Sequence, residues 1–153
     1  MPPLFSSGPL ILGLGNVLMS DDGVGVHAVR ALVSEGFSPD QCIEVGTAVL
    51  KAQGLLEEAE SVIVIDAIQA NGKPGTVYCM DADDAALSRR ETLHDLSIAG
   101  VLRLIPEPMR PRVQVVGVEP DCLDYGMSLS NTVAEAITPL LTKIKFLSNH
   151  ESK

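Results

Sequence analysis

Apolar residues occur along this chain in two alternating kinds of run. Short, mostly apolar runs are typical of strands covered on both faces, whereas apolar residues recurring every three or four positions are typical of helices that bury one side. The short runs predict strands over 10–14, 42–45, 61–67, 76–80 and 113–118, and the repeats predict helices over about 24–36, 49–60, 94–104 and 131–146. Because strands and helices alternate, we expect a three-layer α/β sandwich: a mostly parallel, twisted sheet of about five strands with helices on both faces.

Length and composition set the size and character of the expected core. The chain has 153 residues, of which 46% are hydrophobic and only 3% aromatic, so its core must consist mostly of aliphatic side chains. A chain of this length typically forms one domain and buries about two-thirds of its unfolded surface. No linker, repeat or low-complexity segment interrupts it. We therefore expect a single domain over 1–153, with 148–153 as a frayed tail.

The net charge of −9 argues against some classes of binding partner. Nucleic acids and anionic membranes both attract positive surfaces, so we expect neither as a partner. The amino-terminal stretch has no basic region, and the apolar run after it is far shorter than the ~20 residues of a membrane helix, which predicts a cytoplasmic protein. Cys42, Cys79 and Cys122 have no C-x-x-C spacing, which argues against a zinc site or a disulfide framework. We expect Cys42 and Cys79 to be buried thiols in strands.

The first predicted strand and the loop after it form the most distinctive stretch. P-L-I-L-G-L-G-N-V-L-M-S-D-D-G-V-G occupies 9–25 and places two adjacent carboxylates, Asp21 and Asp22, at the start of a helix. Ligands of open α/β sheets bind beyond the carboxyl ends of strands, where this loop would lie. We expect Ser20 or Asp21 to cap the helix. Gly25 weakens the helix by about 1 kcal/mol relative to Ala, which suggests that another backbone or a ligand approaches closely.

Two more residues carry candidate chemistry. Asp66 ends the most hydrophobic strand, where a carboxylate is costly to desolvate unless it is paired or bound. His94 lies at or just before the first turn of its helix, whose positive end disfavours imidazolium and keeps the ring able to coordinate a metal. If the first and third strands are neighbours, Asp22 and Asp66 share the carboxyl edge of the sheet and His94 can fold over it. Two carboxylates and one imidazole suit an open divalent-metal site.

These residues also have purely structural interpretations, which the sequence leaves open. Asp22 fits a helix cap or a favourable charge in a first turn, and His94 fits a surface or capping histidine. His27 lies further along its helix, and we expect it to be exposed.

Taken together, the motifs resemble those of the nickel–iron hydrogenase maturation proteases over nearly the whole chain. The resemblance rests on G-L-G-N-V-L-M-S-D-D-G-V-G (13–25), G-T (46–47), V-I-V-I-D-A (62–67), P-G-T-V (74–77), His94 with the helix after it, V-V-G-V-E-P-D (115–121) and L-S-N-T-V (129–133). It implies a twisted sheet between helices and an endopeptidase that removes a carboxy-terminal extension from a hydrogenase large-subunit precursor once nickel has been inserted.

By position, the resemblance implies that Asp22, Asp66 and His94 contact the metal and form the catalytic region. The nickel would be supplied by the precursor, although another divalent metal could bind in vitro. The sequence does not separate catalysis by the metal from general-base catalysis by a carboxylate such as Asp22. One stretch departs from the family pattern: members commonly carry D-G-G-[ST] after the second strand, whereas this chain has E-V-G-T at 44–47.

Two other classes of function remain as alternatives. The first is a receiver-like signalling domain with Asp66 as the phospho-acceptor and Asp21 and Asp22 holding magnesium, although the expected Lys after the last strand is absent. The second is a degenerate nucleotide-binding domain. Gly13-x-Gly15 begins a dinucleotide fingerprint, but Leu18 stands where its third glycine belongs. Walker A, G-x-S-x-G, H-E-x-x-H and D-[ST]-G motifs do not occur.

Overall fold

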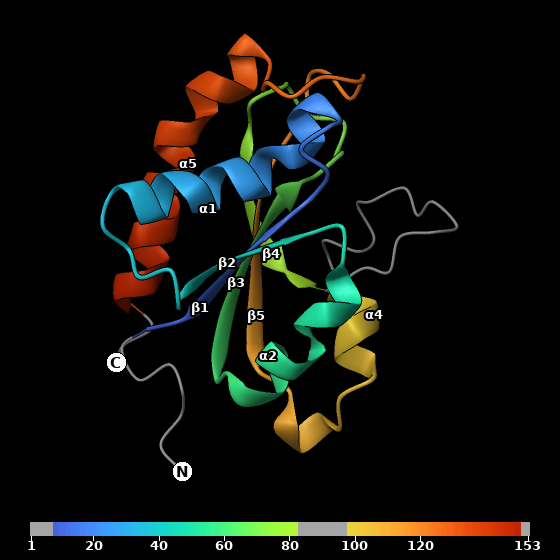
Figure 1. Ribbon diagram of the computed structural model, residues 1–153, viewed down its shortest axis with the longest axis vertical. Coiled ribbons are helices and arrows are strands. Elements are labelled where there is room, and N and C mark those ends of the chain that lie inside the picture. Colours follow the sequence, from blue (N-terminus) through green and yellow to red (C-terminus); the bar gives the residue numbers. More distant parts are fainter. Residues whose placement is uncertain (1–7, 83–97, 151–153) are drawn as a thin grey trace.

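The computed structural model describes residues 8–82 and 98–150, which form a five-stranded sheet with helices on both faces (Figure 1). The strands are β1 (Leu10–Leu14), β2 (Cys42–Gly46), β3 (Ser61–Ala67), β4 (Val77–Asp81) and β5 (Arg112–Val118). The helices are α1 (Val24–Ser34), α2 (Gln53–Glu58), α4 (Ile98–Arg103) and α5 (Asn131–His150), with 3-10 turns η1 (Ser20–Gly23), η2 (Val49–Ala52) and η3 (Glu107–Met109). Each predicted strand is confirmed to within one residue at either end.

The sheet has the strand order β2-β1-β3-β5-β4. The strands β2, β1, β3 and β5 run parallel to one another. β1 lies between β2 and β3, which confirms that the first and third strands are neighbours. β3 is buried along all but its first residue, as its run of β-branched side chains predicts for a central strand. The carboxyl ends of β1 and β3 therefore lie side by side at one edge of the sheet.

β4 is the exception, because it pairs with β5 in the antiparallel direction. The segment between β3 and β4, residues 68–76, contains no helix. A parallel connection requires a crossover of a dozen or more residues, usually through a helix. The chain therefore turns back at the carboxyl edge and adds β4 to the outside of β5.

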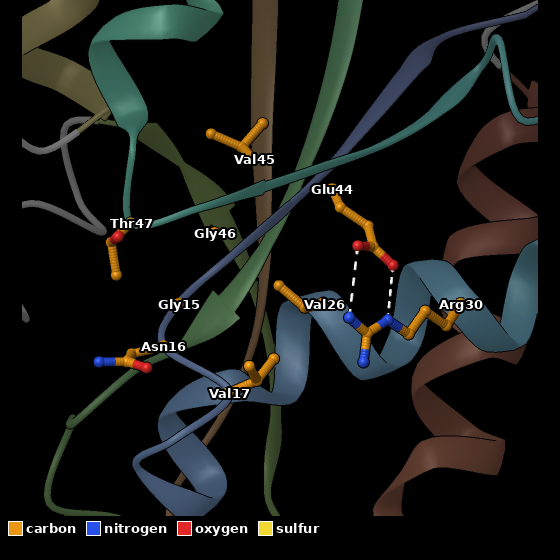
Figure 2. A pocket seen from close by; sticks show the side chains of 9 residues that line it. All are labelled: Gly15, Asn16, Val17, Val26, Arg30, Glu44, Val45, Gly46 and Thr47. Atoms are coloured by element: carbon orange, nitrogen blue, oxygen red, sulfur yellow. Dashed lines mark hydrogen bonds and ion pairs between the residues drawn. The ribbon is translucent and has the colours of Figure 1, made fainter. Parts of the chain in front are cut away.

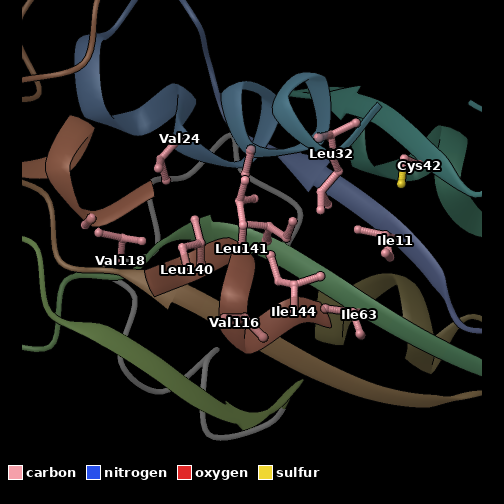
Figure 3. Packing of buried hydrophobic residues seen from close by; sticks show 14 of the residues in the cluster. Ile11, Val24, Leu32, Cys42, Ile63, Val116, Val118, Leu140, Leu141 and Ile144 are labelled. Carbon is pink, nitrogen blue, oxygen red and sulfur yellow. The ribbon is translucent and has the colours of Figure 1, made fainter. Parts of the chain in front are cut away.

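Two aliphatic cores lie on the two faces of the sheet. α1 and α5 cover one face, and Figure 3 shows this cluster, which includes Ile11, Leu32, Ile63, Val116, Leu140 and Ile144. α2 and α4 cover the other face over a cluster that includes Leu10, Leu12, Leu56, Val62, Val64 and Val101. The layered arrangement confirms the predicted α/β fold with a mostly parallel sheet.

α1 packs unusually close to the sheet because two glycines lie at the contact. A Cβ on Gly25 would lie 2.1 Å from the carbonyl oxygen of Ile65, and one on Gly13 would lie 2.4 Å from the carbonyl oxygen of Gly25. The expected close approach of a backbone at Gly25 is thus confirmed. It holds the start of α1, and the loop before it, against the carboxyl edge of the sheet.

The structure tests the predicted burial of Cys42 and Cys79 and the predicted end of the last helix. Cys42 is buried as expected, and burial raises the pKa of its thiol to about 11. Cys79 is exposed, because β4 is an edge strand that is covered only in part. α5 continues through His150, so the first residues of the expected frayed tail are helical.

Within 8–82 and 98–150, no helix is both long enough and apolar enough to cross a membrane.

Candidate functional site

The loop between β1 and α1 positions Asp22. The backbone turns sharply at Gly15, whose φ is +110°, and the N–H of Asn16 then donates to Asp22 Oδ2 over 2.9 Å. The Asn16 side chain stabilises the same loop, because its Oδ1 accepts a hydrogen bond from the N–H of Leu18 at 2.9 Å. Asp22 is half-buried, so its carboxylate is fixed by the backbone but still reaches the surface.

Asp66 lies one residue before the end of β3 and is buried. The N–H of Ala67 donates to its Oδ1 at 2.8 Å, which compensates part of the cost of desolvating the carboxylate. A Cβ on Gly15 would lie 1.8 Å from the Asp22 carbonyl oxygen and 3.5 Å from Asp66 Oδ1. Gly15 is therefore the point at which the Asp22 loop reaches the end of β3.

The third predicted ligand, His94, lies outside the described residues. The part of the chain that the structure covers contains no group of three His, Cys, Asp or Glu side chains able to hold a metal ion. Asp22 and Asp66 supply hard oxygen donors at the carboxyl edge of the sheet, which suits a divalent ion that receives further ligands from elsewhere. The three-residue site stays a prediction, with its two carboxylates on adjoining segments.

A pocket of about 290 Å³ opens next to Gly15, between the loop after β1 and the end of β2 (Figure 2). Its lining consists of Gly15, Asn16, Val17, Val26, Arg30, Glu44, Val45, Gly46 and Thr47. At one side Arg30 Nε donates to Glu44 Oε1 at 2.5 Å and Arg30 Nη2 donates to Glu44 Oε2 at 3.4 Å. The E-V-G-T stretch that departs from the family pattern thus forms a wall of the pocket next to Gly15.

Asp21 does not cap a helix, and neither does Ser20. No side-chain capping bond is present at η1 or α1, and Asp21 is fully buried. Its Oδ2 accepts the N–H groups of Asp121 (2.9 Å) and Cys122 (2.8 Å) and the Ser130 hydroxyl (2.8 Å), while its Oδ1 accepts the Ser130 N–H (2.8 Å). The capping prediction was wrong because partners about a hundred residues away satisfy these groups instead.

These hydrogen bonds also determine the charge of Asp21. Burial by itself would raise the pKa of this carboxyl, but the N–H groups of Cys122, Ser130 and Asp121 and the Ser130 hydroxyl together outweigh burial and hold the pKa below its ordinary value. Asp21 is therefore an ionised, buried anchor for the segment after β5, next in sequence to the candidate ligand Asp22.

Glu119 is a third buried carboxylate, in addition to Asp21 and Asp66, and it was not predicted from the sequence as a site residue. It accepts hydrogen bonds from the N–H groups of Ala70 (3.1 Å) and Gly72 (2.5 Å) and from the hydroxyl of Tyr78 (3.1 Å). Burial and the bond to Glu119 raise the pKa of Tyr78. The available signal was an acid directly after a buried strand, the same signal that identified Asp66.

His27 is half-buried rather than exposed. Its Nε2 is enclosed and has no hydrogen-bond partner among the described residues. Burial, followed by the positive charge of Arg30, lowers the pKa of His27, while Glu44 opposes this shift. His27 is therefore a neutral, half-buried imidazole on α1, and the prediction of an exposed side chain was wrong because neighbouring atoms enclose its Nε2.

Comparison with known proteins gives one consistent result. The family model described as hydrogenase maturation protease matches residues 26–145. The hydrogenase 2 maturation protease of Escherichia coli is 30% identical over 142 residues, which are 88% of this chain and 87% of that protein. The hydrogenase expression/formation protein HupD of Rhodobacter capsulatus is 32% identical over 145 residues, 90% of this chain and 69% of that protein.

Two solved structures of hydrogenase maturation proteases are also similar to this chain. The hydrogenase maturating endopeptidase HybD from E. coli superposes with a TM-score of 0.79 at 29% identity, covering 90% of this chain and 89% of that one. HybD from Thermococcus kodakarensis gives a TM-score of 0.74 at 27% identity, covering 92% and 99% of the two chains. Neither the receiver-like nor the nucleotide-binding alternative gains support from these matches.

Proposed function

The chain belongs to the hydrogenase maturation protease family, and on that premise we propose that it removes the carboxy-terminal extension of a nickel–iron hydrogenase large-subunit precursor after nickel has been inserted. The family assigns it to the endopeptidases. The single observation that carries the finer proposal is that the backbone of Asp22 and the carboxylate of Asp66 both adjoin Gly15, on the edge of the sheet where ligands of this fold class bind.

In this proposal Asp22, Asp66 and His94 hold the nickel that the precursor carries. The donor set fits, because carboxylate oxygens and a neutral imidazole are accepted ligands of a borderline divalent ion. A divalent ion there supplies polarisation of the scissile carbonyl or a lowered pKa of a water molecule. The chain itself orients the scissile bond by holding the two carboxylates in fixed positions. The Asn16 N–H donates to Asp22, and the Ala67 N–H donates to Asp66. Alternatively, a carboxylate such as Asp22 acts as the general base.

The adjoining pocket is a second observation that supports the proposal. It shares Gly15 and Asn16 with the Asp22 loop, so a peptide segment that lies in it contacts the loop that carries Asp22. Its polar wall contains the Arg30–Glu44 pair and Thr47. Backbone and side chains of an extended precursor tail would find hydrogen-bonding partners there. An unloaded precursor would lack the metal contact, which explains how cleavage could wait for nickel.

The test is to mix the protein with nickel-loaded and nickel-free precursor and to follow the precursor's intact mass. We expect loss of a carboxy-terminal fragment from the loaded form alone. Asp22→Asn, Asp66→Asn and His94→Ala should each lower the cleavage rate by about 100-fold or more, since each removes a ligand or the base.

Asp40→Asn is the matched control, because Asp40 is an exposed acid in the turn before β2, at the opposite edge of the sheet. It should cleave at the normal rate. Equal cleavage of loaded and unloaded precursor would disprove recognition through nickel. Intact precursor in every mixture would disprove the proposed protease activity on this substrate.

A further inference from the structure

Three large apolar side chains are exposed on two hydrogen-bonded segments next to the candidate site. Leu18 is 51% exposed, Tyr125 89% and Met127 72%. Leu18 belongs to the loop after β1, and the other two belong to the irregular segment 121–130 after β5. Large apolar side chains at this exposure are costly to hydrate, and a cluster of them is typical of a surface that another protein covers.

The two segments are joined into one frame, which we call the clipped loops (residues 16–21 and 121–130). The N–H of Gly126 donates to the Leu18 carbonyl at 2.9 Å, and the N–H of Ser20 donates to the Gly126 carbonyl at 2.8 Å. The Ser20 hydroxyl donates to the Asp124 carbonyl at 2.8 Å. The buried Asp21 carboxylate adds four hydrogen bonds to the same segment.

This frame has a consequence for binding. Ser20 has φ of +51°, a conformation rare for residues other than glycine, yet the hydrogen bonds of the frame hold it there. Apolar side chains on a backbone fixed in this way lose little further freedom when a partner covers them, which favours affinity. In Figure 1 the frame lies at the top of the view, where the segment after β5 runs beside the turn before α1.

The surroundings of the clipped loops indicate what covers them. Asp22 follows the clipped loops directly in sequence, and Asn16 hydrogen-bonds both Asp22 and Leu18, so a protein whose cleaved segment reaches Asp22 comes close to Leu18. Asp121 and Asp124 are exposed at the border of the apolar side chains, on a chain of net charge −9. An apolar centre with a charged border is the usual anatomy of a protein–protein interface, and Tyr and Met are enriched at such centres.

We propose that Leu18, Tyr125 and Met127 form the docking surface for the folded body of the precursor, which meets them with an apolar patch bordered by basic residues. The inference rests on the proposed function and extends it: the candidate site contacts the segment to be cut, and the clipped loops bind the protein that carries it. The surface therefore governs affinity for the precursor, while Asp22 and Asp66 govern the cleavage step.

The experiment compares the double variant Tyr125→Ser/Met127→Ser with Leu104→Ser/Met109→Ser. The control pair is also exposed, but it lies near α4 and η3, before β5 and away from the carboxyl edge. Binding of nickel-loaded precursor is measured by titration, alongside kcat and KM for its cleavage and the melting temperature of each variant. We expect the Tyr125/Met127 variant to bind at least about tenfold more weakly and to raise KM, with kcat and melting temperature near those of the wild type. The control should match the wild type.

The outcomes separate the two proposals. If the wild type cleaves the precursor and the Tyr125/Met127 variant binds it with unchanged affinity, the docking surface is wrong and the proposed function stands. If the wild type is a dimer in solution that the double substitution converts to monomers without loss of precursor affinity, a second copy of the chain covers the surface and the inference is overturned. If the wild type neither binds nor cleaves the precursor, the proposed function fails and the docking inference fails with it.

Discussion

Gly15 shows at the scale of one residue how the candidate site depends on the absence of a side chain. Its φ of +110° is strained for any residue with a Cβ, and the space in which a Cβ would lie is occupied by the Asp22 carbonyl. The same position lies 3.5 Å from Asp66 Oδ1. A methyl group there would separate the two segments that carry the candidate ligands.

We therefore predict that Gly15→Ala lowers the free energy of unfolding by roughly 2–3 kcal/mol and also lowers the cleavage rate of the folded fraction. Urea denaturation and the precursor assay measure the two effects. Gly54→Ala is the control, since a Cβ on Gly54 meets nothing within 4 Å and the residue lies in α2. It should leave cleavage unchanged and stabilise the protein by about 0.5–1 kcal/mol. Normal stability and activity of Gly15→Ala would contradict the assigned role.

At the scale of elements, the connection from β3 to β4 depends on Glu119. This carboxylate, just after β5, accepts the N–H groups of Ala70 and Gly72 and the Tyr78 hydroxyl. It thus ties the turn after β3 to the first part of the antiparallel strand β4. The backbone N–H groups of a turn without regular partners would otherwise be left unsatisfied near the buried end of β5.

We predict that Glu119→Ala destabilises the protein by about 2–3 kcal/mol, because it leaves two backbone N–H groups and one hydroxyl without their acceptor. Tyr78→Phe removes a single donor and leaves the carboxylate its two backbone partners, so it should cost only about 1 kcal/mol. Urea denaturation gives both values, and hydrogen exchange at Ala70 and Gly72 should accelerate in the first variant and not in the second. Equal losses in the two variants would show that the tyrosine contact, rather than the carboxylate, holds the turn.

At the scale of the whole molecule, Asp21 joins parts of the chain that are about a hundred residues apart. The segment after β5 has no strand or helix of its own before α5 begins at Asn131. The ionised carboxylate gives it a fixed position over the loop that precedes α1. The link therefore joins the start and the end of the fold at the edge that carries the candidate site.

This link should make stability depend on pH in a defined direction. The folded-state pKa of Asp21 is lowered from its ordinary value of 3.8, so its contribution to stability is complete above the unfolded-state pKa and is lost as the pH falls through the folded-state pKa. We predict that Asp21→Asn is less stable than the wild type by about 1–3 kcal/mol at neutral pH. The difference should stay constant down to about pH 5 and shrink at lower pH. Urea denaturation of both proteins across this range is the measurement, and a difference that shrinks already between neutrality and about pH 5 would contradict the assignment.

Local sequence patterns were sufficient to predict most of the fold. Continuous β-branched runs such as 61–67 can be buried on both faces only as central strands, so the strand bounds followed from composition. The pattern could not give the direction of β4, because that depends on the length of a connection and on which edge of the sheet remains free. It also gave the wrong exposure for Cys79 and His27, since exposure depends on what packs against a residue and not on its neighbours in sequence.

The candidate site, like the fold, was predicted from the sequence only in part. The sequence by itself determined that acids follow the buried strands, because Asp66 ends an apolar run and Asp22 lies in the segment after another, and the motifs that surround them identified the family. Only the tertiary structure decided the burial and the hydrogen bonds of each acid. Asp21 and Asp22 are adjacent and chemically identical, yet one is buried under four hydrogen bonds from a distant segment and the other is held half-exposed at Gly15. The physical reason is that desolvation and hydrogen bonding act through space, whereas a sequence records only neighbours along the chain.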